Sequence, residues 1–215
     1  MLTVWGRRSS SNVQALMWTI GELGLAYERH DAGFRYGVVD TPAFLAMNPN
    51  GTVPVIKDGD QPPMFETGAI LRYLAARYGD GGAFWPADPT ARATVDQWAE
   101  WAKINVAASF TVPIFWQLVR THPQDRDATL FAHGFKALNR CLDIAEPRLA
   151  AHAHLVGEAF TLADVQFGHL LYRYYDLPLD RTERPALAAY YERLEARPAF
   201  REHVIVSYDE LRVPT

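Results

Sequence analysis

The chain has 215 residues and a net charge of −4, and its 49% hydrophobic and 21% charged residues are typical of a folded globular protein. Because basic residues are scattered and no apolar run reaches the roughly 18–20 residues of a bilayer span, we expect no nucleic-acid partner, no membrane partner and a cytoplasmic location. The single cysteine, Cys141, excludes an internal disulfide and a metal site built on paired cysteines, so we expect no metal, and any thiol chemistry must use a ligand's thiol.

The first 79 residues alternate short strand-like and helix-like segments in the order β-α-β-α-β-β-α. Strands are expected at 2–5, 25–30, 52–56 and from 63. Helices are expected over 13–24, from 42 toward 47, and from 67 to 78. Gly24 is well placed to end the first helix, Thr41 and Pro42 are typical of a helix start, and Asp58-Gly59 predicts a tight turn. The pattern predicts an α/β domain over residues 1–79.

Residues 80–89 are rich in Gly, Pro and Asp, which predicts a linker between two compact units. Beyond it every long segment is helical in pattern, so residues 90–215 are predicted to form an all-helical domain. Helices are expected over 90–120, 128–151, 162–175, 185–196 and 198–205. The first of these is expected as one long helix, or as two if Pro113 kinks it.

Ser9, Ser10, Ser11 and Asn12 lie between the first strand and the first helix. At a helix N-terminus, unpaired backbone N–H groups and the helix dipole favour an anion, so a thiolate bound there would stay ionised. Cysteines near helix N-termini have pKa values lowered from about 8.5 to about 3.5–7.5. The alternative interpretation is that these residues only cap the helix.

Two further clusters are candidate ligand-binding segments. In Asn48-Pro49-Asn50-Gly51-Thr52-Val53-Pro54, two prolines bracket a turn that enters a strand. If the Val53–Pro54 bond is cis, the Val53 main chain faces outward and can pair with an extended peptide; an ordinary turn into an edge strand is the alternative. Glu66 and Thr67 start a helix, where Thr67 can hold a carboxylate and Glu66 an ammonium group, unless Thr67 is a plain N-cap.

The order and spacing of these clusters closely resemble those of soluble, cytosolic glutathione transferases, especially bacterial relatives of the serine-type (theta-, zeta- and beta-like) classes. The resemblance rests on Ser10 after a first strand, on the Asn48–Pro54 motif, on the run Glu66–Leu74 and on the helical second half, and it covers essentially the whole chain. It implies an α/β plus all-α protein, in which an N-terminal thioredoxin-like domain (βαβαββα) is followed by an all-helical C-terminal domain, with glutathione as co-substrate.

The resemblance also implies roles by position. Ser10 matches the activating serine, whose hydroxyl hydrogen-bonds the glutathione sulfur, with Ser11 and Asn12 as close alternatives. Val53 matches the residue whose main chain pairs with the cysteinyl part of glutathione, and Pro54 matches the cis-proline beside it. Glu66 and Thr67 match the pair that holds the γ-glutamyl end, although many relatives carry Ser where this chain has Thr67. The glutathione-binding residues implied are Arg35 (for the glycyl carboxylate), Asn50, Thr52, Val53, Pro54, Glu66 and Thr67.

The aromatic-rich stretch 110–116 lies where the family builds its electrophile pocket, and the implied wall residues are Phe110, Pro113, Phe115 and Trp116. Core packing is the alternative for each. Thr161 and Asp164 are predicted to form a capping box, and His152 and His154 are expected at the surface. The family is usually dimeric, so we expect a homodimer.

The function implied is that of a glutathione transferase, which activates the glutathione thiol for attack on an electrophilic, largely apolar small molecule in detoxification. Two alternatives use the same fold. One is a glutathione-dependent disulfide or peroxide reductase, which the absence of a cysteine near the first helix disfavours. The other is a non-catalytic interaction protein, which predicts a lost thiol site.

Overall fold

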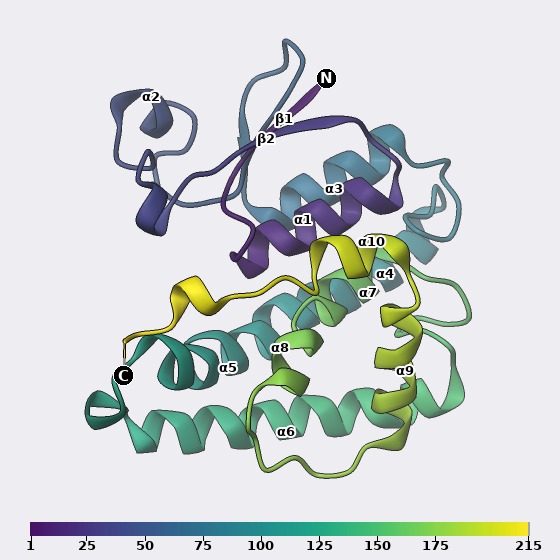
Figure 1. Cartoon of the computed structure of the whole chain (residues 1–215). Coiled ribbons are helices and arrows are strands. Elements are labelled where there is room, and N and C mark those ends of the chain that lie inside the picture. The colour runs from purple at the N-terminus through teal and green to yellow at the C-terminus, as the bar shows by residue number, and fades with distance from the viewer. Residues whose placement is uncertain (215) are drawn as a thin grey trace.

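The computed structural model describes residues 1–214, and its first half is built on one mixed four-stranded sheet in the order β2-β1-β3-β4 (Figure 1). The strands are β1 (Leu2–Trp5), β2 (Tyr27–His30), β3 (Val55–Asp58) and β4 (Met64–Phe65). β1 pairs in parallel with β2 and antiparallel with β3, and β3 pairs antiparallel with β4. The predicted order of strands and helices is confirmed, although β2 and β3 begin later than the sequence pattern suggests.

Three helices belong to this half: α1 (Ser11–Glu22), α2 (Pro42–Leu45) and α3 (Thr67–Tyr78). α1 forms because its apolar residues recur at helical spacing and are buried, and it ends before Gly24, which has a left-handed φ of 62°. α2 begins as predicted, because the Thr41 hydroxyl accepts a hydrogen bond from the Phe44 N–H at 3.3 Å and Pro42 takes the first helical position.

The second half is helical. After a stretch without helix or strand, it contains α4 (Pro89–Trp101), α5 (Ala107–Phe110), α6 (Ala128–Ala151), α7 (Leu162–Gly168), α8 (Leu171–Asp176), α9 (Pro185–Glu195) and α10 (Pro198–His203). The bounds predicted for α6 are confirmed, and those of α9 and α10 agree within two residues. Figure 1 shows α1 and α3 beside each other between the sheet and the helical half, with α10 of that half next to α1.

In two segments, 90–120 and 162–175, the structure does not form the continuous α-helix that the sequence pattern suggests. Residues 90–120 contain two π-helical stretches, 102–106 and 111–120, which flank α5. Pro113 lies in the second stretch, where it removes one backbone donor and its ring packs against Gly134 of α6. Residues 162–175 divide into α7 and α8, because the Leu170 N–H bonds the Phe167 carbonyl three residues back and the His169 ring bonds the Val165 carbonyl at 3.0 Å.

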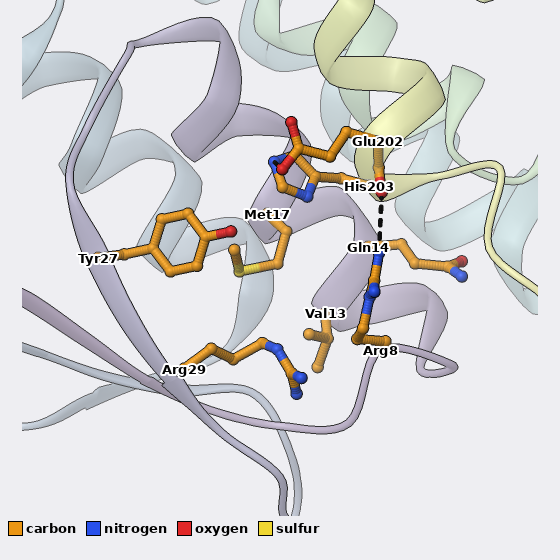
Figure 2. A pocket seen from close by; sticks show the side chains of 8 residues that line it. All are labelled: Arg8, Val13, Gln14, Met17, Tyr27, Arg29, Glu202 and His203. Carbon is orange, nitrogen blue, oxygen red and sulfur yellow. Dashed lines mark hydrogen bonds and ion pairs between the residues drawn. The ribbon is translucent and has the colours of Figure 1, made fainter.

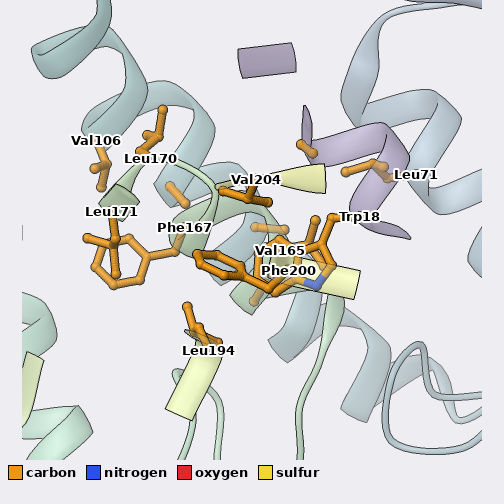
Figure 3. Close-up of a cluster of buried hydrophobic side chains, with 14 of the residues drawn as sticks. Trp18, Leu71, Val106, Val165, Phe167, Leu170, Leu171, Leu194, Phe200 and Val204 are labelled. Carbon is orange, nitrogen blue, oxygen red and sulfur yellow. The ribbon is translucent and has the colours of Figure 1, made fainter. Parts of the chain in front are cut away.

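One continuous apolar core joins the two halves (Figure 3). Trp18 of α1 is fully buried and meets Phe200 of α10 edge to face, with ring centroids 4.8 Å apart. A polar clamp reinforces this contact, since Arg197 donates to both carboxylate oxygens of Glu22 at 2.7 and 2.6 Å. The shared core fixes the position of the α1 N-terminus relative to the helical half.

The predicted capping box is present at α7, where the Asp164 carboxylate accepts from the Thr161 N–H at 2.7 Å. His152 is exposed as expected, but the surface prediction for His154 is wrong. Its side chain is only 13% exposed and its ring lies 3.8 Å from the Asp164 carboxylate, because α6 ends at Ala151 and the chain turns back toward α7. Within residues 1–214, no helix is both long and apolar enough to cross a membrane.

Candidate functional site

A cleft of about 290 Å³ lies where the turn between β1 and α1 faces the second π-helical stretch. Ser10, Ser11 and Asn12 line it from the N-terminus of α1, and Thr52 and Val53 line it from the turn before β3. The helical half contributes further residues, among them Phe115 and Trp116. Residues predicted from three remote parts of the sequence therefore share one cleft.

Ser10 is the N-cap residue of α1, with an extended backbone and 8% of its surface exposed. Although Ser10 occupies the N-cap position, its hydroxyl makes no capping hydrogen bond. The hydroxyl and the first N–H groups of α1 are hydrogen-bond donors at the positive end of a helix dipole. An anionic sulfur in the cleft would meet both.

The Asn12 side chain is held from the helical half. Its Oδ1 accepts a hydrogen bond from Lys103 Nζ at 2.8 Å, and Lys103 belongs to the first π-helical stretch. Burial lowers the pKa of Lys103, and the charge of Glu66 partly opposes this. With its oxygen occupied, Asn12 has only its NH₂ group left to donate to a ligand.

The Val53–Pro54 peptide bond is cis, as the proline pattern suggested. Asn48 holds the preceding turn, since its Nδ2 donates to the Thr52 carbonyl at 2.8 Å and its Oδ1 accepts from the Asn50 N–H at 3.0 Å. β3 begins only at Val55, so the Val53 backbone lies outside the sheet pairing. The Asn50 side chain contacts Asn48 at 3.1 Å and does not line the cleft.

Besides Asn50 and Pro54, three more predicted ligands lie outside the cleft lining. Glu66 is exposed with a left-handed φ of 68°, and Thr67 is buried as the first residue of α3. Arg35 is turned away, because its guanidinium pairs with Glu210 at 2.7 Å and with the Tyr36 hydroxyl at 3.1 Å. The structure therefore does not bring Glu66, Thr67 or Arg35 into the lining of this cleft.

The four expected wall residues divide into two pairs. Phe115 and Trp116 line the cleft, and Trp116 is 40% exposed. Phe115 is nevertheless as buried as the core residue Phe110, each with 1% exposure. Phe110 does not line the cleft, and Pro113 packs against Gly134 of α6. The π-helical winding of residues 111–120 decides which side chains face the cleft, and a sequence pattern read at ordinary helical spacing does not show this.

Residues 1–76 match the model for the glutathione S-transferase N-terminal domain, and residues 107–198 match the model for the glutathione S-transferase C-terminal domain. The chain belongs to the glutathione S-transferase family. The family and fold class inferred from the sequence are confirmed, and so is the assignment as a glutathione transferase enzyme.

Relatives of this glutathione S-transferase match over nearly their full length. Glutathione S-transferase GstB of Escherichia coli (strain K12) is 35% identical, with 96% of this chain and 99% of the relative covered. Glutathione S-transferase 3 of Zea mays is 32% identical, with 94% and 93% covered. Among solved structures, the theta-class glutathione S-transferase of Xanthomonas axonopodis pv. citri with glutathione bound is 38% identical, with a TM-score of 0.89 and 96% and 98% covered.

Sequence reasoning missed the arginines of this transferase. Arg173 of α8 is 3% exposed and donates to the Ser9 carbonyl at 2.6 Å, so the helical half holds the turn that carries Ser10. Burial lowers the pKa of Arg173 to about 10, which leaves it cationic at neutral pH. Arg7 and Arg120 also line the cleft. No sequence signal identifies them, because Arg120 and Arg173 are 53 positions apart and neither lies in a recognisable motif.

A second cavity, of about 210 Å³, is lined by side chains of α1, β2 and α10 (Figure 2). Arg8 points into it and donates to the Glu202 carbonyl at 3.3 Å. Arg8 therefore does not belong to the cleft of this transferase, although it is adjacent to Arg7 in the sequence. The two neighbouring arginines offer a matched pair for experiments on the charge of the cleft.

Proposed function

We propose that this glutathione transferase activates the glutathione thiol through Ser10, whose hydroxyl donates to the sulfur and stabilises the thiolate. The observation that carries this proposal is the N-cap position of Ser10, where its hydroxyl has no capping partner and faces the cleft. The first N–H groups of α1 add a favourable dipole, and the charge of Arg173 lies behind the same turn. Ser11 and Asn12 are assigned supporting contacts.

The remainder of glutathione is proposed to lie along the cis-proline turn. The Val53 main chain is free to pair with the cysteinyl part because β3 begins two residues later. Thr52 and Pro54 shape this edge, and Asn50 acts through the turn that it stabilises together with Asn48. Glu66 and Thr67 are proposed to hold the ammonium and carboxylate of the γ-glutamyl end at the start of α3.

In the reaction, the thiolate sulfur attacks an electrophilic carbon, a carbon–sulfur bond forms, and the leaving group departs with its electron pair. The thiol proton passes to solvent when glutathione binds. The protein contributes proximity and an ionised nucleophile. Trp116, with 40% of its surface exposed, supplies an aromatic surface against which the electrophile packs, and the buried Phe115 lies behind it.

A reductase that forms its own mixed disulfide is disfavoured by the chemistry of the site. Cys141 lies in α6, is buried, and borders a different groove. The non-catalytic alternative predicts that the anion site at α1 is lost, whereas Ser10 is present with its hydroxyl uncommitted.

We further propose a cytoplasmic homodimer that acts in detoxification. Support for dimerisation comes from a groove of about 530 Å³ between the α4–α5 segment and α6, lined by Trp101, Cys141 and Ile144, with Ile144 41% exposed. Sedimentation analysis should give twice the mass of the chain. Replacement of Ile144 by Glu should shift the protein toward monomer, and a monomeric wild type would refute this part of the proposal.

Glutathione binding and turnover test the main proposal together. Calorimetry should detect glutathione binding by the folded protein, and conjugation of chlorodinitrobenzene should require it. The Thr67→Ala variant should weaken glutathione binding by about tenfold to 150-fold, because it removes a hydroxyl contact of about 1.5–3 kcal/mol to a charged group. Folded protein that binds no glutathione would overturn the assignment of this site.

A further inference from the structure

The cleft carries an unusual excess of positive charge. Arg7, Arg120 and Arg173 all line it, and none of its lining residues in the described chain is Asp or Glu. Arg120 contributes to lowering the pKa of Arg7, after burial, so the two guanidinium groups are close enough to repel each other. Like charges gathered in a concave site favour an anionic ligand.

The three arginines differ in how many hydrogen-bond partners their guanidinium groups already have within the protein. Arg173 is committed to the protein, since it donates to the Ser9 carbonyl at 2.6 Å and to Gln14 Oε1 at 3.2 Å. Arg7 has a buried Nε without a hydrogen-bond partner. The Arg120 guanidinium has no hydrogen-bond or ion-pair partner among residues 1–214, and it lies against the Trp116 and Phe34 rings. Arg7 and Arg120 are therefore the groups with donors to spare.

The nearest acidic side chain does not neutralise them. Glu210 raises the pKa of Arg7 through space, but its carboxylate pairs with Arg35 at 2.7 Å and accepts from the Tyr36 hydroxyl at 3.2 Å. Arg35 and Glu210 thus form an ion pair with each other, and neither lines the cleft. The charge of Arg7 and Arg120 is left facing the space in front of Ser10.

Aromatic rings stand beside these charges. The Arg120 guanidinium lies 4.5 Å from the Trp116 ring centroid and 5.3 Å from that of Phe34, and Arg7 lies 5.6 Å from Phe34. Phe34 and Trp116 are 47% and 40% exposed, so both rings present apolar surface to a ligand. Arg120 follows Trp116 by one turn in the helical half, the half that supplies the expected electrophile wall.

We propose that the electrophile of this enzyme is an aromatic molecule with a carboxylate, whose ring packs on Trp116 and Phe34 and whose carboxylate pairs with Arg120 and Arg7. The inference rests on the proposed function and replaces the expected, largely apolar electrophile with an anionic one. With para-(chloromethyl)benzoate, the sulfur–carbon bond forms at the benzylic carbon as the carbon–chlorine bond breaks, and chloride leaves with the electron pair. The carboxylate stays unchanged and serves recognition only.

The test compares para-(chloromethyl)benzoate with its methyl ester at saturating glutathione, with each rate divided by the uncatalysed rate of the same compound. We expect the normalised kcat/KM of the acid to exceed that of the ester by about tenfold or more, as a charge-assisted hydrogen bond allows. Arg120→Gln should lower kcat/KM for the acid by about tenfold and change that for the ester less than about twofold. Arg120→Lys should recover part of the loss, because it restores the charge without the forked geometry.

Two controls make the result specific. Arg8→Gln removes an equal charge next to Arg7 in sequence, but from the other cavity (Figure 2), and should leave the ratio of acid to ester unchanged. Calorimetry with S-(para-carboxybenzyl)glutathione and S-benzylglutathione measures the same preference without turnover, so a catalytically impaired variant still gives an answer.

Three outcomes overturn the inference. If the ester is conjugated and the acid shows no preference, the transferase assignment stands and the anionic electrophile fails. If Arg120→Gln raises only the KM for glutathione, Arg120 holds the glycyl carboxylate of glutathione instead. If neither compound reacts and glutathione does not bind, the proposed function itself fails.

Discussion

Replacement of Ser10 by Ala should raise the pKa of bound glutathione by about 1–2 units. The hydroxyl has no capping partner at the N-cap of α1, and Ser10 is only 8% exposed. Solvent would therefore replace its hydrogen bond to a thiolate poorly. A hydrogen bond to a charged group contributes about 1.5–3 kcal/mol, and one pKa unit corresponds to about 1.4 kcal/mol. The α1 dipole is unchanged in the variant, so part of the stabilisation should remain.

The effect on rate depends on pH. If the wild-type site lowers a thiol pKa of about 8.5 to about 6.5, roughly three quarters of the thiol is ionised at pH 7. A rise of 1–2 units leaves about 24% to about 3% ionised, so the rate at pH 7 should fall by about 3-fold to 25-fold. Above about pH 9 the thiol ionises in both proteins, and the two rates should converge.

Ultraviolet titration of the bound thiolate measures the pKa directly, and the pH profile of chlorodinitrobenzene conjugation measures its consequence. Ser11→Ala is the matched control, because Ser11 lines the same cleft one residue along α1 and should leave the pKa nearly unchanged. Binding of S-methylglutathione, which has no thiol proton, should be similar in all three proteins. An unchanged pKa in Ser10→Ala, or a loss of rate that persists at high pH, would refute the reasoning.

Three further predictions concern groups outside the glutathione contacts. Lys103→Met should raise the bound thiol pKa by about 0.5–1 unit, because it removes a buried positive charge near the α1 N-terminus; ultraviolet titration checks this, and an unchanged pKa would contradict it. Gly168→Ala should lower the free energy of unfolding in urea by about 1–3 kcal/mol, since its Cβ would lie 2.5 Å from Leu194 Cδ1, whereas Gly157→Ala, with no atom within 4 Å, should not. Burial lowers the pKa of His169 to about 3, so the unfolded chain binds a proton below about pH 6.5 that the folded protein excludes; stability should fall by about 2 kcal/mol between pH 7 and pH 5 from this group, and less in His169→Asn.

The sequence by itself determined the fold and the elements that carry the first half of the site. Period-two and helical patterns gave the order of strands and helices, and proline placement predicted the turn at Val53–Pro54, which is cis. The Ser10 region and the Glu66-Thr67 pair were recognisable because each lies at a helix start, a local feature set by neighbouring residues. The Thr161–Asp164 capping box was predictable for the same reason.

Only the tertiary structure decided the character of the cleft. Arg173 reaches the Ser9 carbonyl across 164 positions of sequence, and Arg7 and Arg120 meet only because the shared core brings β1 and the helical half together. The π-helical winding of residues 111–120 places the exposed Trp116 at the cleft and Pro113 against α6, which ordinary helical spacing does not predict. Local propensity follows from adjacent residues, whereas the charge and shape of a cleft depend on long-range packing, and a single sequence does not state which remote side chains will meet.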